Sequence, residues 1–351
     1  MGDGGGFNGI GFDADAVAPG GRRVFDLPLP NLYTHAQLSM PIQVLQGKHK
    51  GPRLFISAAL HGDEINGVEI IRRLLALPLL KRLRGTLVAV PVVNLYGFLS
   101  QTRYLPDRRD LNRSFPGSET GSLAARLAHA FSTQVVAKAD IGIDLHTGAL
   151  HRTNLPQIRA SLAHPETRRL AQAFGAPVIL DGKAPEGSLR AMVDYPLLVF
   201  EGGEALRFDE FTIRAGVRGV IRTLRALEML PPAKDPGRLP AAVVARSSHW
   251  LRAPQSGILR TTKPLGAQVE AGEVLAYVSD PFGEREAAVS SPQAGLVIGC
   301  SQIPLVHEGE ALFHIAQVGR PGALADTVEQ YHEALAEMTE LADPHFAEVR
   351  P

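Results

Sequence analysis

Two side chains that can bind a metal ion stand three residues apart in His61-Gly62-Asp63-Glu64. The apolar run Leu54–Leu60 precedes them, and an amphipathic helical pattern follows. The order predicts a strand, a turn and a helix, with both side chains at the carboxyl end of the strand, where open α/β sheets bind ligands. Imidazole nitrogens and carboxylate oxygens are both zinc ligands. The same pair could instead be a capping acid and a partly exposed histidine, so the interpretation depends on a third ligand.

His146 supplies that third candidate, because it ends a second apolar run in Ile141–Gly148. A catalytic zinc commonly takes three protein ligands and leaves one position for water or substrate. Two ligands from one turn and a third from another strand end match that arrangement. The alternative is that His146 only begins a polar loop. We predict one zinc ion per chain, held by His61, Glu64 and His146.

Glu201 follows a strongly apolar run, Leu197–Phe200, and precedes two glycines. Burying a carboxylate at the end of an apolar strand costs free energy unless the carboxylate is paired or has a function. Zinc activates water at neutral pH, and a nearby carboxylate can then take a proton during attack and return it to the leaving amine. We predict that role for Glu201; the alternative is an acid that caps the next turn.

Asn112 and Arg113 lie in a polar loop, Gln101–Gly117. The planar guanidinium of arginine binds a carboxylate through two parallel hydrogen bonds, and an asparagine adds a neutral donor. Beside a metal ion, this pair would orient an anionic substrate. The alternative is a solvated loop whose charged residues pair with one another.

The rhythm of apolar residues around these motifs predicts an α/β fold. Alternation in Arg22–Gln46 indicates short antiparallel strands, and from Pro52 onward strands alternate with helices, which favours βαβ units and parallel strands. We expect strands at Leu54–Leu60, Thr86–Val93, before His146, at Val178–Leu180 and at Leu197–Phe200, and helices from the Glu64 turn to about Leu77, at Leu123–Lys138, Glu166–Phe174 and Glu210–Leu227.

The composition excludes several classes of protein. Lys+Arg and Asp+Glu both number 36 among 351 residues, so no general basic surface for nucleic acid is expected. No apolar run approaches the roughly 20 residues that span a bilayer, and the glycine-rich start, MGDGGGFNG, is not a secretory signal. A single cysteine, Cys300, excludes an internal disulfide and suits a reducing compartment, so a cytoplasmic protein is expected. In its apolar segment, Cys300 is predicted to be a buried structural thiol.

A proline-rich linker, Leu230–Pro240, precedes a weak internal repeat. Ala253–Leu259 is similar to Ser291–Val297, and Val269–Leu275 is similar to Val306–Leu312. Two copies made of strands and turns predict a small all-β domain of two interlocked halves, which resembles the lipoyl/biotinyl hammerhead fold. The hairpin that carries the prosthetic lysine in that fold is Asp280–Glu284 here and contains no lysine. We therefore expect a structural domain or a wall of the active site, not a swinging-arm carrier.

The motifs HGDE, DLNRSFPG, DLHTG and FEGG, in this order, resemble those of the succinylglutamate desuccinylase/aspartoacylase family of zinc-carboxypeptidase-like hydrolases. The resemblance covers about Arg22–Leu227. It implies a mixed, mainly parallel sheet flanked by helices, one zinc ion, and hydrolysis of the linear amide bond of a small, anionic N-acyl amino acid. It also implies that Arg103 polarises the scissile carbonyl, with Glu201 as the general base and acid. Arg190 matches a further substrate-binding arginine, although the segment from it to Glu201 is one residue longer.

The repeat domain departs from the better-known members and resembles a branch that includes deacetylases of N-acetylated diamino acids. The expected organisation is a flexible N-terminal tail (1–21), a zinc hydrolase domain (22–235), a β-rich hammerhead-like domain (236–320), and a C-terminal helix and tail (321–351). Two other functions remain open: a metallocarboxypeptidase acting on short peptides, and a non-catalytic zinc-dependent protein that binds small anions. The acyl group, the amino acid and the oligomeric state, including a homo-oligomer, also stay open.

Overall fold

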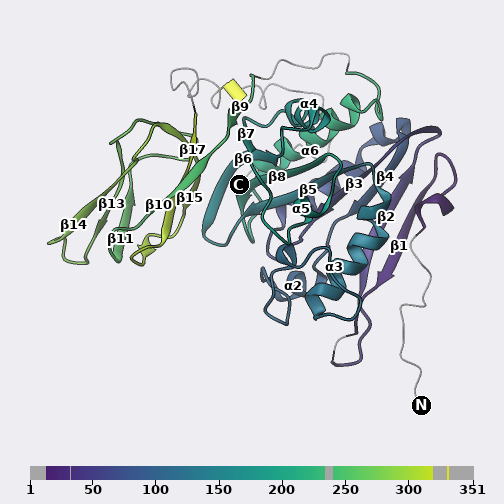
Figure 1. Ribbon diagram of the computed structural model, residues 1–351, viewed down its shortest axis with the longest axis horizontal. Helices are drawn as coiled ribbons and strands as arrows, with labels where there is room; N and C mark the ends of the chain where they lie inside the picture. The colour runs from purple at the N-terminus through teal and green to yellow at the C-terminus, as the bar shows by residue number, and fades with distance from the viewer. Residues whose placement is uncertain (1–12, 32, 234–239, 319–329, 332–351) are drawn as a thin grey trace.

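The computed structural model describes residues 13–31, 33–233, 240–318 and 330–331 (Figure 1). We use the term leading region for residues 13–233 and trailing region for residues 240–318. The strands of the leading region are β1 (Arg22–Pro28), β2 (Ser39–Gln46), β3 (His49–Ala58), β4 (Arg84–Val90), β5 (Ile141–Gly148), β6 (Arg152–Ala160), β7 (Val178–Asp181) and β8 (Leu197–Glu204). Its helices are η1 (Ala14–Ala16), α1 (Asn66–Ala76), η2 (Pro78–Arg82), α2 (Leu95–Ser100), η3 (Leu111–Arg113), α3 (Leu123–Gln134), η4 (Val136–Lys138), α4 (Pro165–Phe174), α5 (Leu189–Met192) and α6 (Glu210–Ala226).

One mixed sheet runs through the molecule in the order β1-β2-β4-β3-β5-β8-β6, and continues into strands of the trailing region. Its centre is parallel, because β4, β3, β5 and β8 all run in the same direction. Strands β1 and β2 are antiparallel, as are β6 and β8. The mixed α/β fold with its parallel centre is therefore confirmed.

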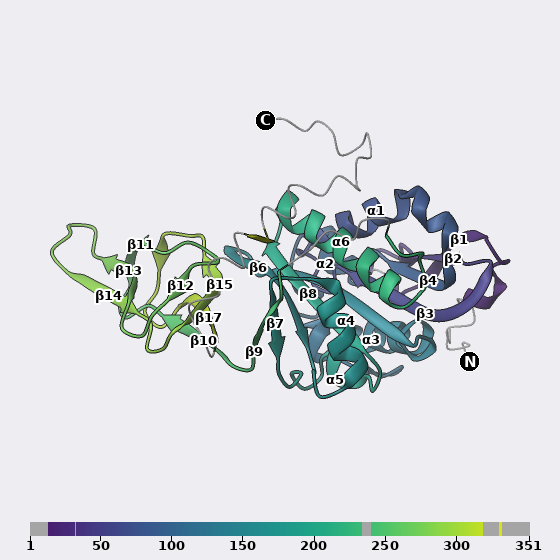
Figure 2. The same ribbon diagram turned by 90° about the horizontal axis from the view of Figure 1, so that it is seen from above.

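Alternating side chains of the central strands enter two apolar cores, one on each face of the sheet. On β3, Leu54 and Ile56 pack in the core that contains α1, α4 and α6, whereas Phe55 packs in the core that contains α3. Both faces of these strands are covered, which explains their nearly continuous apolar sequence. Figure 2 shows α1 and α6 along one side of the sheet and α3 on the other.

The trailing region consists of strands only, within its described residues. Strands β15 and β17 belong to the main sheet, while β14, β13, β11 and β16 form a second sheet of four strands. The two repeats exchange short strands, since β16 pairs with β11 and β12 pairs with β15. Two interlocked halves are thus observed, and the hammerhead resemblance stays a prediction. The strands are β9 (Val243–Ala245), β10 (Ser248–Arg252), β11 (Gly257–Thr261), β12 (Gln268–Val269), β13 (Val274–Ser279), β14 (Glu286–Ser290), β15 (Gly295–Ser301), β16 (Leu305–Val306) and β17 (Ala311–Gln317).

The trailing region is joined to the leading region along a strand edge. Strand β15 pairs antiparallel with β6, and β9 pairs in parallel with β7 (Figure 1). Cys300 lies on β15 opposite Thr153 and is buried, and burial raises the pKa of its thiol to about 11. The predicted burial of this thiol is confirmed.

The structure differs from the expected organisation in two ways. The tail expected at 1–21 does not extend that far, because η1 lies within it and Ala14 and Val17 pack into the core. Strand β6 and helix α2 were not predicted at all. The C-terminal helix expected within 321–351 lies outside the described residues except at positions 330 and 331, where Tyr331 is buried against Phe211.

Candidate active site

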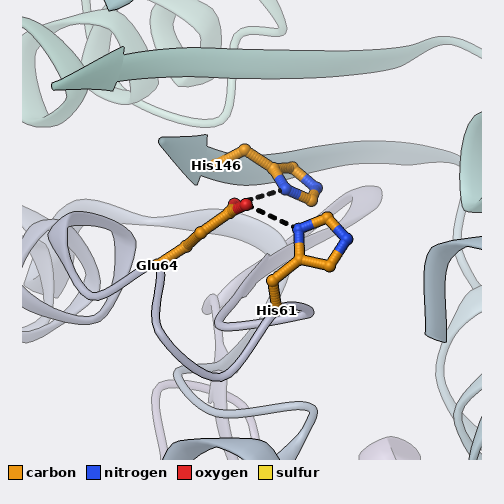
Figure 3. Close-up of side chains that lie close together, drawn as sticks. All are labelled: His61, Glu64 and His146. Atoms are coloured by element: carbon orange, nitrogen blue, oxygen red, sulfur yellow. Dashed lines mark hydrogen bonds and ion pairs between the residues drawn. The ribbon is translucent and has the colours of Figure 1, made fainter. Parts of the chain in front are cut away.

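His61, Glu64 and His146 form a buried cluster near the carboxyl ends of the central strands β3 and β5 (Figure 3). One potential ligand atom from each lies within 4.8 Å of the other two. Nδ1 of His61 lies 2.7 Å from Oε1 of Glu64, and Nδ1 of His146 lies 2.7 Å from Oε2 of the same carboxylate. The structure therefore brings together the three predicted metal ligands.

The parallel pairing of β3 with β5 explains why residues so distant in sequence meet. Ala58, at the end of β3, is opposite Leu145 on β5, so the turn after β3 faces His146. Glycine is required within that turn at position 62. A Cβ atom there would lie 1.9 Å from the carbonyl carbon of Gly97, so a larger side chain would push the histidine turn away from α2.

Each histidine is also contacted by a second carboxylate on its other ring nitrogen. Nε2 of His61 lies 3.1 Å from Oδ1 of Asp110, and Nε2 of His146 lies 2.7 Å from Oδ2 of Asp144. The hydroxyl of Ser57 donates to Asp144 over 2.7 Å. Such outer carboxylates fix the orientation and tautomer of metal-binding histidines. Sequence reasoning missed both, although the spacing Asp144-x-His146 was visible.

The charges in the cluster shift its pKa values in opposite directions. Burial favours the neutral imidazole, but the charge of Glu64 and the hydrogen bond to Asp110 leave the pKa of His61 above its ordinary value. The pKa of His146 is raised well above its ordinary value, because Asp144 and Glu64 outweigh burial. Burial opposes the charged form of Glu64, yet the two histidines hold its pKa well below the usual range. Glu64 is therefore a carboxylate, the form that can bind a metal.

The donor set fits zinc. Two imidazole nitrogens and one carboxylate, each histidine oriented by an outer acid, match the three protein ligands of catalytic zinc sites.

Glu201 lies beside this cluster on the next strand. It is opposite His146 in the parallel pairing of β5 with β8, and its side chain is 14% exposed. Its Oε2 atom accepts a hydrogen bond of 2.9 Å from Nδ2 of Asn154 and forms an ion pair of 2.8 Å with Arg159. Asn154 and Arg159 both lie on β6, the strand that sequence reasoning missed.

Arg103 contacts two of the acids around the cluster. Its guanidinium donates to Glu64 over 3.2 Å and to Oδ2 of Asp110 over 2.9 Å. The side chain is 27% exposed and lines a cavity that also borders His61 and Glu64. This position allows contact with a substrate and also stabilises the carboxylates that hold His61.

The three predicted substrate-binding residues line the same cavity. The Oδ1 atom of Asn112 accepts from the amide of Leu189, while Arg113 donates to the carbonyl of Asn112. Arg190 donates to the carbonyl of Gly182, and burial together with the charge of Arg159 lowers its pKa. Each is thus placed by backbone contacts that leave other donors available.

The cavity has a volume of about 600 Å³ and contains all eight predicted site residues in its lining. The trailing region contributes to the same lining, with Trp250 and His314 among its residues. Their rings stack 4.6 Å apart, and burial lowers the pKa of His314 to about 3, so this part of the wall is neutral. The trailing region is therefore a wall of the cavity within the same chain, one of the two roles expected for it.

The comparisons with known proteins identify the family. Residues 50–227 match the model of the succinylglutamate desuccinylase/aspartoacylase catalytic domain. The chain belongs to this family, and the expected enzyme class, a hydrolase of linear amide C–N bonds, is confirmed.

Individual relatives extend the likeness beyond the catalytic domain. The chain is 26% identical over 340 residues to the N-alpha-acetyl-L-2,4-diaminobutyric acid deacetylase of Halomonas elongata, covering 88% of this chain and 94% of that protein. A succinylglutamate desuccinylase/aspartoacylase structure from Rhodobacter sphaeroides has a TM-score of 0.80 at 22% identity and covers 90% of this chain and 100% of its own. The product-bound ectoine utilization protein EutE (DoeB) from Ruegeria pomeroyi has a TM-score of 0.76 at 24% identity, with 84% and 95% covered. These structures share the fold of both regions.

Across the described ranges, no helix combines the length and apolar character needed to cross a membrane.

Proposed function

We propose that this protein is a zinc-dependent deacylase that hydrolyses the amide bond of a small N-acyl amino acid. The observation that carries the proposal is the buried cluster of His61, Glu64 and His146 with Glu201 on the adjacent strand. When bound to these three residues, zinc would supply a Lewis acid for the carbonyl and for the attacking water.

The chain's own residues would divide the remaining work. Glu201 would accept the proton of the attacking water and return it to the amine nitrogen as the amide bond breaks. Arg103 would donate to the carbonyl oxygen as negative charge develops there, because its guanidinium lies beside Glu64 at the edge of the cavity. Asn112 and Arg113 would hold the carboxylate of the amino acid, with Arg190 as a further donor.

The charge of the cavity supports an anionic substrate. Its lining contains more basic than acidic side chains, which favours binding of small anions. The basic residues are Arg103, Arg113, Arg152, Arg159, Lys183, Arg190 and Arg246, and the acidic ones are Glu64, Asp144, Asp181 and Glu201.

The Halomonas elongata relative acts, by its name, on an N-acetylated diamino acid. Its match spans both regions of this chain, including the trailing wall of the cavity. N-acetylated diamino acids are therefore the first substrates to test. A cavity of about 600 Å³ also has the usual size of a small-molecule site.

The test is a hydrolysis screen of zinc-loaded protein over N-acetyl, N-succinyl and N-formyl amino acids and short peptides, with and without a chelator. We expect chelator-sensitive release of the free amino acid from at least one acyl amino acid. Faster cleavage of peptides would establish the carboxypeptidase alternative. Tight binding of acyl amino acids without any hydrolysis would establish the anion-binding alternative and overturn the proposal.

A further inference from the structure

The two oxygens of the Glu201 carboxylate have different surroundings. Oε2 is held by two donors, Nδ2 of Asn154 at 2.9 Å and the guanidinium of Arg159 at 2.8 Å. Oε1 accepts no hydrogen bond from any residue that the structure describes. A side chain with three rotatable bonds is thus fixed through one oxygen, while the other remains available to a reacting proton.

The two donors flank Glu201 on the neighbouring strand. In the antiparallel pairing of β6 with β8, Asn154 is opposite Gly203 and Arg159 is opposite Val199. The β8 residues opposite the two donors therefore lie two positions from Glu201, one on each side of it. Diagonal neighbours of this kind reach each other when they share a face of the sheet.

A β-bulge in β6 puts both donors on that shared face. Side chains of a regular strand alternate, so residues five apart, such as Asn154 and Arg159, would point to opposite faces. Between Asn154 and Gln157, however, β6 advances three residues while β8 advances only two, from Gly203 to Glu201. The one extra residue reverses the alternation, and bulges beside active sites commonly redirect a side chain in this way. Pro156 lies within the bulge, a position in sheets where proline is tolerated.

The trailing region supports Asn154 from the other edge of β6. Gly299 on β15 is opposite Asn154, and a Cβ atom at Gly299 would lie 2.7 Å from Oδ1 of Asn154. Glycine at this position therefore leaves the space that the amide group occupies. A methyl group there would displace the end of the Asn154 side chain.

We propose that Asn154 and Arg159 are positioning residues for Glu201, and that Gly299 of the trailing region preserves the position of Asn154. Because Oε2 is held by its two donors, Oε1 is the oxygen that accepts and transfers the proton. The trailing region thereby contributes to the geometry of the proton carrier as well as to the cavity wall. This inference rests on the function proposed above, in which Glu201 moves the proton.

The kinetic test uses Asn154→Ala, Gly299→Ala and the double variant, measured with the best substrate of the screen. Misplacing a catalytic group by about 1 Å can lower the reaction rate about 10²-fold. We therefore expect kcat to fall between about tenfold and 10²-fold in each single variant, while KM and zinc content change little. Because Gly299→Ala acts through Asn154, the double variant should be no slower than Asn154→Ala. Thr153→Ala, at the same contact between β6 and β15, is the matched control and should retain wild-type kcat.

Two kinetic results would overturn the inference. One is wild-type kcat in Asn154→Ala; the other is losses that multiply in the double variant, because a general weakening of the strand contact would act independently of the Asn154 amide. Melting temperatures of all four variants identify any such weakening.

Crystal structures of wild type, Asn154→Ala and Gly299→Ala provide a readout independent of turnover. We expect one ordered Glu201 conformer in the wild type and a displaced or multiple conformer in both variants. An unmoved Glu201 carboxylate would contradict the positioning role. If the wild type hydrolysed nothing in the screen, the proposed function would fail, while these structures would still decide whether Asn154 and Gly299 position Glu201.

Discussion

The leading and trailing regions line one cavity but contribute different groups to it. The leading region carries all eight predicted site residues, and each side chain of its candidate metal-binding cluster is held by at least two hydrogen bonds. The trailing region contributes the stacked, neutral rings of Trp250 and His314 together with Arg246, and no group of candidate metal ligands among its described residues. The difference indicates that the chemistry belongs to the leading region, and that the trailing region shapes what can reach it.

Glu201→Gln should have the largest effect if the leading region performs the chemistry. Glutamine keeps the shape and can still accept from Asn154, but it cannot take a proton. We expect kcat to fall by about 10²- to 10⁴-fold, the usual contribution of general acid–base catalysis, with zinc content unchanged.

The matched control is Glu69→Gln on α1, whose carboxylate pairs with Arg72 and Arg73 away from the cavity. It should retain kcat within about twofold, as expected of a surface ion pair. Wild-type turnover in Glu201→Gln would require another group to carry the proton.

Asp144→Asn tests the outer acid behind His146. The substitution keeps the size of the side chain but removes the charge that orients the imidazole. We expect zinc affinity to fall by about 10- to 100-fold, measured by competition with a chromogenic chelator. Asp140→Asn, at the opposite end of β5, is the control, and equal affinities for the two variants would contradict the role of Asp144.

Arg113→Ala tests substrate binding at the cavity. Hydrogen bonds to charged groups contribute about 1.5–3 kcal/mol, so KM should rise at least about tenfold while kcat changes little. Arg109→Ala, in the same loop but outside the cavity lining, should leave KM unchanged. A fall in kcat alone would show that Arg113 acts on the reaction step instead.

Trp250→Ala should have the smallest effect, because the trailing region is assigned to shape. Loss of the ring that stacks on His314 should raise KM by a few-fold and broaden the range of acyl groups accepted, as expected when a hydrophobic wall is enlarged. A loss of kcat as large as that of Glu201→Gln would remove the distinction between the two regions.

Most of the leading fold was predictable because its signals are local and periodic. The helix expected at Glu210–Leu227 is α6, Glu210–Ala226, with Asp209 as its cap. The apolar runs before His61, His146 and Glu201 located β3, β5 and β8, although β3 ends at Ala58 and the other two strands continue to Gly148 and Glu204. Strand β6 was missed because Pro156 and its polar neighbours conceal the alternation, and the bulge interrupts it.

What the sequence could not predict depends on pairing between distant strands. Asn154 and Arg159 contact Glu201 only because β6 lies beside β8, and Asp110 reaches His61 from a loop 49 residues away. The approach of the trailing region to the cavity likewise depends on the pairing of β15 with β6. A linear pattern contains no information on such register.

The central claim is that His61, Glu64 and His146 bind one zinc ion. Anomalous diffraction from crystals loaded with zinc tests it most directly. We predict one peak per chain within about 2.0–2.2 Å of Nδ1 of both histidines and of a Glu64 oxygen, the normal zinc bond lengths. A zinc-loaded crystal with no peak between these three residues, or with its strongest peak elsewhere, would contradict the account.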